Sequence, residues 1–282
     1  MKNTLERLKN ITTRSVFLLL IGSFLVTAAF PILWLVTAAF RPNIELSSDP
    51  FGIPSTFTLD NFKTVFTDSN VLTYIKNSGI VSVISLITIV MLSSMVAFAI
   101  NKMRFKGSKG VFRYFLIGLT IPQAVTLIPL FIMFTKLNII DTRLSVILPL
   151  VAFQLPVSIL LFVNFYRYIP DEIIEAAVID GCGVYRVFFS IIFPLSLNTI
   201  LTVLAMNFIT VWNDYIFSLV FINSTSLKTI SVGLQDFIGP RGLTDWGATF
   251  ASICLSTLPT LIIYFGLNKK MTAGLTLGAV KS

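Results

Sequence analysis

The chain contains no histidine and only two cysteines, Cys182 and Cys254. Without a cluster of these residues a conventional zinc site lacks ligands, and two distant cysteines make no disulfide framework. Charged residues are also scarce, at 12% of 282 residues, whereas a soluble domain has roughly 25%. No G-x-x-x-x-G-K-[ST] phosphate-binding loop occurs, so the chain carries no ATP site of that kind.

What the chain has in abundance is apolar surface: 55% of its residues are hydrophobic, and its mean hydropathy is +0.87. A helix needs about 20 apolar residues to cross a bilayer core. Six stretches are long enough, which predicts an all-α polytopic membrane protein with six transmembrane helices. They are Val16–Phe40, Ile75–Ile100, Val111–Phe134, Leu144–Tyr166, Leu195–Phe221 and Thr249–Leu267. Pro122 and Pro129 are expected to kink the third stretch.

The first stretch could be a cleaved signal peptide, because Arg14 precedes it and small residues occur at Thr27-Ala28-Ala29. It is longer than a signal peptide, however, and continues apolar through Pro31-Ile32-Leu33-Trp34. We therefore expect a retained membrane anchor.

Basic residues gather in three segments that six spans would place on one side. They are Lys2, Arg7, Lys9 and Arg14; Lys102, Arg104, Lys106, Lys109 and Arg113; and Lys269, Lys270 and Lys281. The positive-inside rule makes this side the cytosol, with both termini inside. The same rule explains the net charge of +8 without nucleic-acid binding.

The organisation predicted is a single transmembrane domain over residues 1–282. Residues 41–74 would form an outer loop rich in turn formers, with acids at Glu45, Asp49, Asp60 and Asp68. Residues 169–194 would form a cytosolic loop, and residues 268–282 a cytosolic tail. We see no internal repeat and no second domain.

The 169–194 loop is acidic on a side where the orientation rule favours basic residues. Pro170 suits the first position of a short helix, with Asp171 and Glu172 in its first turn. The spacing of Ile173, Ile174, Ala177 and Val178 predicts one apolar stripe, with Glu175 and Ala176 off it. Gly181 and Gly183 would end this helix in a sharp turn. A second helix would run from about Val184 to Pro194, near the entry to the fifth span.

Two interpretations of this hairpin are open from the residues alone. It could lie on the membrane interface as an amphipathic helix, or it could dock a soluble partner. Interfacial helices carry Lys and Arg toward anionic lipid, whereas this one has four acids and no base between Pro170 and Gly181; docking is favoured. Glu172 could serve the helix dipole only, and for Asp180 a capping role competes evenly with a functional one.

The loop closely resembles the "EAA" coupling loop of ABC importer permeases, whose pattern is roughly E-A-A-x-x-x-G, nine residues, then I-x-L-P. Glu175-Ala176-Ala177 and Gly181 match, Ile191 and Pro194 fall in place, and Phe193 replaces the usual leucine. Flanking segments resemble the carbohydrate-uptake class, as in the second permease of maltose-type systems. These segments are Phe57–Phe62, Arg104–Gly107, Pro122-Gln123 with Pro129, Trp212-Asn213-Asp214 and Ala273–Lys281.

This resemblance implies a type I ABC importer permease fold and a heteromeric complex in the plasma membrane, in a bacterium. The partners would be a second permease, two ABC ATPase subunits and an extracellular sugar-binding protein. No cofactor would bind this chain; ATP and Mg²⁺ would bind the ATPases. The coupling residues carried over are Glu172, Glu175, Ala176, Ala177, Asp180 and Gly181. The ATPase-contacting tail would include Gly274, Thr276, Gly278 and Lys281.

Polar residues inside the predicted spans are candidates for a sugar path, since intramembrane polar groups face cavities or partners. Asp214 is the one acid placed well inside a span, and a role in capping or bracing helices near the outer interface is favoured over a place in the path. The other candidates are Gln123, Thr126, Gln154, Asn164, Asn207, Trp212 and Asn213. Interhelical hydrogen bonding explains most such residues.

Other functions fit the sequence less well. A secondary transporter or channel would leave the acidic hairpin and the tail without a role, and few intramembrane ionisable groups are available for proton coupling. An ABC importer of amino acids, phosphate or metals would share the central loop but not the flanking motifs. A membrane-embedded enzyme would need a nucleophile–base or metal set, and none stands out.

Overall fold

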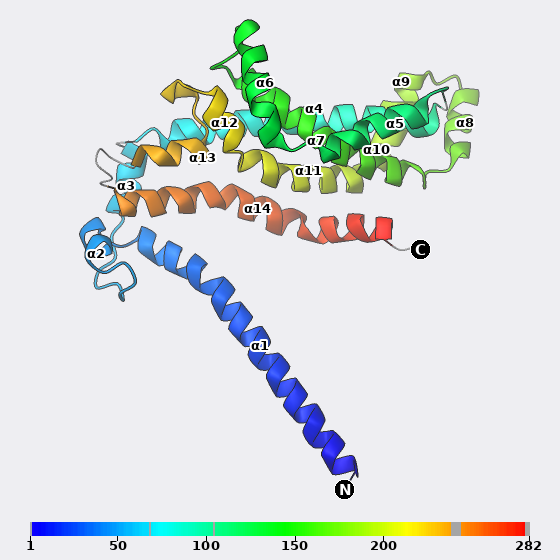
Figure 1. Ribbon diagram of the computed structural model, residues 1–282. Coiled ribbons are helices and arrows are strands. Elements are labelled where there is room, and N and C mark those ends of the chain that lie inside the picture. The colour runs from blue at the N-terminus through cyan, green and yellow to red at the C-terminus, as the bar shows by residue number, and fades with distance from the viewer. Residues whose placement is uncertain (1, 68, 104, 238–243, 280–282) are drawn as a thin grey trace. The chain divides into compact units, whose positions relative to one another are not determined.

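The computed structural model describes residues 2–67, 69–103, 105–237 and 244–279, and the side chains of all these except 2–13, 15 and 268–279. The regular elements of the described chain are helices (Figure 1), which confirms the all-α prediction. They belong to two compact units, residues 1–69 with 235–255 and residues 70–234 with 256–282.

The first unit contains α1 (Lys2–Ala39), α2 (Asn43–Ser48), α3 (Asp60–Thr67) and the beginning of α14 (Trp246–Ala279). Within α1, residues Val16–Ala39 are apolar and long enough to span a membrane. Most of these side chains are exposed, Leu19 and Phe24 by 73% and 72%. A helix that is apolar all round needs lipid or a partner chain as its surroundings.

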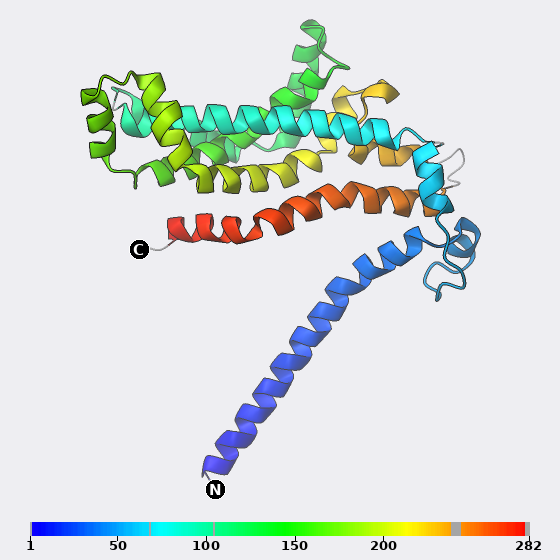
Figure 2. The same ribbon diagram turned by 180° about the vertical axis from the view of Figure 1, so that it is seen from behind.

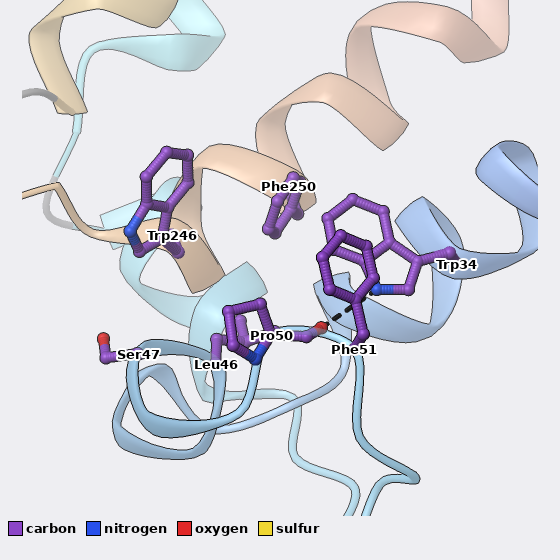
Figure 3. Close-up of a pocket in the computed structure, with 7 residues that line it drawn as sticks. All are labelled: Trp34, Leu46, Ser47, Pro50, Phe51, Trp246 and Phe250. Carbon is purple, nitrogen blue, oxygen red and sulfur yellow. Dashed lines mark hydrogen bonds between the residues drawn. The ribbon is translucent and has the colours of Figure 1, made fainter.

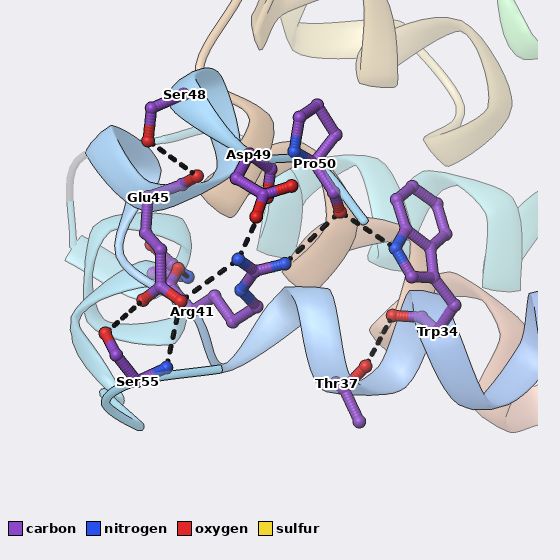
Figure 4. A network of polar contacts seen from close by, with 9 residues as sticks. Trp34, Thr37, Arg41, Glu45, Ser48, Asp49, Pro50 and Ser55 are labelled. Carbon is purple, nitrogen blue, oxygen red and sulfur yellow. Dashed lines mark hydrogen bonds and ion pairs between the residues drawn. The ribbon is translucent and has the colours of Figure 1, made fainter. Parts of the chain in front are cut away.

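A buried arginine organises the segment that follows α1, which the sequence predicted to be a small outer element (Figure 4). Arg41 is 1% exposed, and its guanidinium donates to Glu45 Oε1 at 3.0 Å, to the Asp49 carbonyl at 3.0 Å and to the Pro50 carbonyl at 3.2 Å. Ser55 donates its backbone N–H to the same Glu45 carboxylate at 2.9 Å. This bond, with those from Arg41 and the Ser55 hydroxyl, holds the pKa of Glu45 below its ordinary value.

An aromatic cavity of about 200 Å³ lies beside this network (Figure 3). The Trp34 indole N–H donates to the Pro50 carbonyl at 3.0 Å, and its ring lies 5.2 Å from Phe51 and 5.0 Å from Phe250. The bond and the ring contacts fix the end of α1 against the loop and α14 within this unit. The cavity is lined by Trp34, Leu46, Ser47, Pro50, Phe51, Trp246 and Phe250.

The second unit is built on two long helices, α4 (Val71–Lys102) and α7 (Arg143–Tyr166), which pack along each other. Helix α11 (Leu197–Trp212) packs against both. The buried face of α4 carries small residues that let helices approach closely, as membrane helix interfaces do; they are Ser78, Ser82, Ser85, Ser93, Ser94 and Ala97. The resulting core includes Ile89, Leu150, Phe162 and Val203.

The third predicted span, Val111–Phe134, consists of two helices: the expected kink is a sharp bend, and it lies at Pro122 and not at Pro129. Helix α5 (Ser108–Ile117) and the turn η1 (Gly118–Thr120) are separated from α6 (Gln123–Lys136) by a bend of 102°. The break occurs because Pro122 has no N–H and forces Ile121 into an extended conformation (φ −85°, ψ 115°). Gly118 permits the close approach of this turn to α7, since a Cβ there would lie 2.9 Å from Pro156 Cγ.

The fifth predicted span, Leu195–Phe221, also needs correction. The chain approaches it through α9 (Val184–Val187), the π-helical turn η2 (Phe188–Ile192) and α10 (Phe193–Leu195), then bends by 74° into α11. Helix α11 ends at Trp212, and a separate helix α12 (Ile216–Phe221) follows. Within the described part of the chain, four helices are thus long and apolar enough to cross a membrane, and the number of spans rises to as many as six if each bent pair is one span.

The segment after α12 contains η3 (Thr225–Leu227), α13 (Ile230–Gly233) and η4 (Leu234–Phe237). Residues 222–230 of this segment are fastened to the rest of the second unit by polar side chains. The Asp141 carboxylate accepts hydrogen bonds from the backbone N–H groups of Asn223 and Ser224, both at 2.9 Å, and from the Ser224 hydroxyl. The Asn77 amide donates to the Ser226 and Lys228 carbonyls at 2.8 and 3.0 Å.

Candidate functional site: the loop between α7 and α11

The acidic hairpin folds as predicted into two short helices joined by a glycine turn (Figures 1 and 2). Its first helix, α8 (Asp171–Ile179), begins directly after Pro170. Gly181 has a φ of +79°, the left-handed conformation that glycine adopts without steric cost. The Cys182 N–H then donates to the Ala177 carbonyl at 2.9 Å and closes the helix.

Helix α8 presents one continuous exposed face. Glu172, Glu175, Ala176 and Ile179 have i, i+3, i+4, i+7 spacing and are all exposed. The Ile179 side chain is 85% exposed. This isoleucine projects beside two glutamates, on a helix outside the apolar spans. Its apolar surface is therefore available to a partner molecule.

The predicted apolar stripe is only half correct. Ala177 is buried and Ile174 is half-buried, but Ile173 and Val178 are 38% and 58% exposed. Ile174 and Ala177 lie three residues apart and face the rest of the unit, so α8 rests on a narrow strip. Most of its surface, including Asp180, remains open for another molecule.

A lysine at the end of α4 holds the start of this loop. Lys102 donates from Nζ to the Ile169 carbonyl at 2.6 Å and to Asp171 Oδ1 at 2.8 Å. The Lys102 side chain is 5% exposed. The neighbouring Asn101 amide donates to the Val163 carbonyl of α7 at 2.9 Å. From the sequence, Lys102 belonged only to the orientation signal, and Asp171 only to the helix dipole.

The Lys102–Asp171 ion pair neutralises one of the four acids of the loop. Four acids and no base lie between Pro170 and Gly181, and Lys102 pairs with Asp171. Glu172, Glu175 and Asp180 are exposed and form no ion pair with the described basic side chains. Three exposed carboxylates on one short helix suit a basic partner surface.

The second limb of the hairpin packs against the same end of α4. Phe188, at the start of η2, lies 5.4 Å from Phe98, ring centre to ring centre. Beside this contact is an apolar cavity of about 400 Å³ between α4 and the second limb. It is lined by Met95, Phe98, Ala99, Met103, Val184, Tyr185 and Phe188.

The predicted tail residues are only partly covered by the structure. Gly274, Thr276 and Gly278 belong to the backbone of α14, and their side chains are not among those described. Lys281 lies outside the described residues. Contact of the tail with an ATPase stays a prediction.

The polar candidates for a sugar path belong to α6, α7, α11 and the two residues after α11. Asn207 is 2% exposed and donates to Ser158 Oγ at 3.0 Å and the Val203 carbonyl at 2.7 Å. The Trp212 indole N–H donates to the Ser256 carbonyl of α14 at 2.9 Å. Both residues thus serve contacts within and between helices, as most intramembrane polar groups do.

The remaining candidates lie at chain breaks or on α7. Asp214 accepts hydrogen bonds from the backbone N–H groups of Phe217 and Ser218, at 3.3 and 3.0 Å, and from the Ser218 hydroxyl at 2.9 Å; it therefore caps α12. Asn213 is exposed just before it, Gln123 begins α6 at the break, and Gln154 is half-buried on α7. A cavity of about 380 Å³ at the break before α6 is lined by Thr126, one of the candidates, and by Phe153 among others.

Comparison with known proteins identifies this arrangement. Residues 89–272 match the family described as "Binding-protein-dependent transport system inner membrane component", a range that includes the whole acidic hairpin. The chain belongs to this family. Its members are the membrane permease components of ABC importers, in which a separate subunit hydrolyses ATP.

Curated relatives cover almost the full length. The chain is 33% identical over 258 residues to the arabinooligosaccharides transport system permease protein AraQ of Halalkalibacterium halodurans, covering 90% of this chain and 91% of the relative. It is 30% identical over 269 residues to the trehalose/maltose transport system permease protein MalG of Thermococcus litoralis, covering 94% and 96%. The resemblance to permeases of the carbohydrate-uptake class is thereby confirmed.

A solved structure has the same fold. A chain from the crystal structure of a bacterial ABC transporter involved in the import of the acidic polysaccharide alginate superposes with a TM-score of 0.79 at 20% identity. The match covers 90% of this chain and 94% of that chain. The protein is therefore a multi-pass membrane protein with the ABC importer permease fold.

Proposed function

We propose that this chain is one of two permease subunits of an ATP-driven sugar importer in a bacterial plasma membrane. Residues 1–282 form a single permease domain whose six spans, two of them bent, leave both termini in the cytosol. The partners are a second permease, two ABC ATPase subunits that bind ATP and Mg²⁺, and an extracellular sugar-binding protein. The names of the relatives, which transport arabinooligosaccharides or trehalose and maltose, support a sugar as cargo.

The observation that carries the proposal is the exposed face of α8. Glu172, Glu175, Ala176 and Ile179 combine carboxylates, a small residue and an 85% exposed isoleucine. The glutamates would meet basic residues of an ATPase, Ala176 would allow close approach, and Ile179 would fill an apolar pocket. Gly181 and Asp180 would hold the turn, and the tail residues Gly274, Thr276, Gly278 and Lys281 would extend the same interface.

The role of such a helix is to carry a displacement into the membrane. ATP binding would close the two ATPases, shift the helix docked on each, and switch the permeases between inward-open and outward-open states. Two polar breaks, at Gln123 and at Asn213-Asp214, are the places along the spans where sugar hydroxyls could find hydrogen-bonding groups. Gln154, Asn207 and Trp212 would support the path from neighbouring helices.

The test is purification of the tagged chain in mild detergent from its own host, followed by identification of the co-purifying chains. We expect an ABC ATPase, a second permease and a sugar-binding protein. Uptake by the reconstituted complex of maltose, trehalose and arabinooligosaccharides, each with and without ATP, then addresses the cargo. A homo-oligomer that transports without an ATPase would overturn the proposal in favour of a secondary transporter.

A further inference from the structure

The way in which the coupling loop is attached to the membrane helices carries a second inference. The apolar contacts of helix α8 with the rest of the unit are made by Ile174 and Ala177, while most of the other side chains of the helix are exposed. Its start is nevertheless fixed, because the Lys102 ammonium donates to the Ile169 carbonyl and to the Asp171 carboxylate. An ammonium has three donors and no acceptor, so one lysine can hold both groups at once.

The environment makes this contact stronger than an ordinary surface ion pair. Exposed pairs contribute roughly 0–1 kcal/mol because water and salt screen them. The Lys102 side chain is 5% exposed, although Asp171 is 38% exposed. Removal of the Asp171 carboxylate would leave the poorly solvated Lys102 ammonium without its counterpart, which is costly.

The helix that carries Lys102 is the central one of the second unit. Helix α4 packs along α7 and against α11, and Asn101 ties its last turn to the Val163 carbonyl of α7. One turn earlier, Phe98 contacts Phe188 of the second limb. Both limbs of the loop therefore meet the last two turns of α4, one through a charged group and the other through aromatic rings.

We infer that Lys102 is a positioning residue that makes α8 and the end of α4 move as one body when the ATPase displaces the loop. This inference rests on the proposed function, since it assigns the route by which that displacement reaches the membrane. The route enters α4 and α7 directly through Lys102. The covalent connection through α9, η2 and α11 is then a second route.

The test measures the distance between α8 and α4 during the ATP cycle, and needs no knowledge of the sugar. Spin labels are placed at Val178→Cys on α8, a 58% exposed position outside the docking face, and at Ile87→Cys on α4, a 59% exposed position, with Cys182 and Cys254 replaced by serine. Ile87 lies roughly 22 Å along the helix from Lys102 at 1.5 Å per residue. Double electron–electron resonance is recorded on the purified permease–ATPase complex, nucleotide-free and trapped with ATP and vanadate.

We expect the same narrow distance distribution in both states for the otherwise unaltered complex. Lys102→Met should retain ATP hydrolysis but broaden the distribution and shift its mean between the two states. Lys102→Arg keeps the charge and several donors and should restore the narrow distribution. Lys109→Met makes the same chemical change at an exposed residue of α5 and should have no effect.

A shift of the α8–α4 distance in the unaltered complex, or an unchanged distribution in Lys102→Met, would overturn the inference. If Lys102→Met does not assemble, Asp171→Asn decides. It removes the ion pair and keeps the bond to Ile169, so a broadened distribution supports the inference and an unchanged one overturns it. Failure of the proposed function has a different signature: the unaltered chain would purify without vanadate-sensitive ATP hydrolysis.

Discussion

Two connecting segments of the second unit are fastened to it in opposite ways. The segment after α12 is held by the Asp141 carboxylate, the Asn77 amide and the Ser78 hydroxyl, which accepts a hydrogen bond from the Ile230 N–H at 2.9 Å. Arg143 in turn donates to Asn77 Oδ1 at 2.9 Å. The segment after α7 rests on Lys102 and a narrow apolar strip. One segment has its shape fixed within the chain, while the other keeps an open surface for a partner.

The two kinds of attachment constrain a loop to different degrees. Several directional hydrogen bonds to backbone groups fix a loop in one conformation, because every bond constrains a different residue. The single buried amine of Lys102 fixes only the start of α8. Most of the rest of this helix stays exposed to a partner, and a displacement of the helix is passed to α4 through that one point. Variants that remove one attachment at a time therefore separate a defect in coupling from a defect in stability.

The largest expected effect is on transport, at the open surface. Glu175→Lys reverses the charge of an exposed residue on the docking face, so it should repel a basic ATPase surface and lower uptake by roughly tenfold or more, equivalent to about 1.4 kcal/mol or more of lost contact. Uptake per purified complex measures this. Membrane insertion should be unchanged, and Glu175→Gln should be milder. Wild-type uptake by Glu175→Lys would exclude a charged contact at this position.

The next effect concerns the turn that orients α8. Gly181 has a φ of +79° whereas Gly183 has a φ of −72°, and a Cβ at either position would meet open space. Gly181→Val should therefore strain the backbone by roughly 1–2 kcal/mol or more and reduce co-purification of the ATPase. Gly183→Val is the matched control and should assemble normally. Equal recovery of the ATPase with both variants would show that the turn conformation is not needed for assembly.

A smaller effect is expected at the well-fastened segment. Asp141→Asn converts an ionised acceptor of three hydrogen bonds into a neutral amide. Because the site is partly exposed, we expect a loss of about 1–2 kcal/mol, measured as a lower thermal midpoint in detergent. The ATPase should still co-purify, because α8 is untouched. A loss of ATPase binding without a change in the thermal midpoint would contradict the division between the two segments.

The smallest effect is a dependence of stability on pH. Hydrogen bonds from the Ser224 hydroxyl and the Ser224 and Asn223 N–H groups hold the pKa of Asp141 below its ordinary value of 3.8. A lowered carboxyl pKa stabilises the folded state above pH 3.8 or so, and this contribution is lost as the pH falls through the lower folded value. The difference in thermal midpoint between the wild type and Asp141→Asn should therefore shrink below about pH 4. A difference that stays constant from neutral pH to pH 3 would exclude ionisation of Asp141 as its source.

Four of the predicted spans coincide with described helices that are long and apolar enough to cross a membrane, because hydropathy over 20 residues reports directly on burial in lipid. The sequence does not predict which proline breaks a helix. Pro122 separates α5 from α6, whereas Pro129, Pro149, Pro156 and Pro259 remain inside helices. A proline removes one hydrogen bond in every case; whether the helix continues depends on packing by residues distant in sequence, such as Pro156 against Gly118.

The candidate site was likewise predicted in part from the sequence. The acids, the alanines and the glycine turn follow from local chemistry, and their positions on α8 were predicted. The apolar stripe was half wrong because periodicity assumes that every apolar side chain faces its own chain, whereas Ile173 and Val178 are exposed. Lys102 was missed since the positive-inside rule already accounted for a lysine there. Only the fold brings it to Ile169 and Asp171, 67 and 69 positions along the chain.

The π-helical turn η2, Phe188–Ile192, has a consequence for the direction in which the fifth span faces. A π turn accommodates one extra residue compared with an α turn, and each residue of an α-helix advances the direction of its side chain by about 100°. Residues after η2 are therefore rotated by about that angle relative to an uninterrupted helix. Phe188, at the start of the turn, contacts Phe98 of α4, and α10 continues in the shifted phase as far as the bend before α11. With one extra residue in the turn, the side chains before and after η2 can pack against different neighbours without a loop between them.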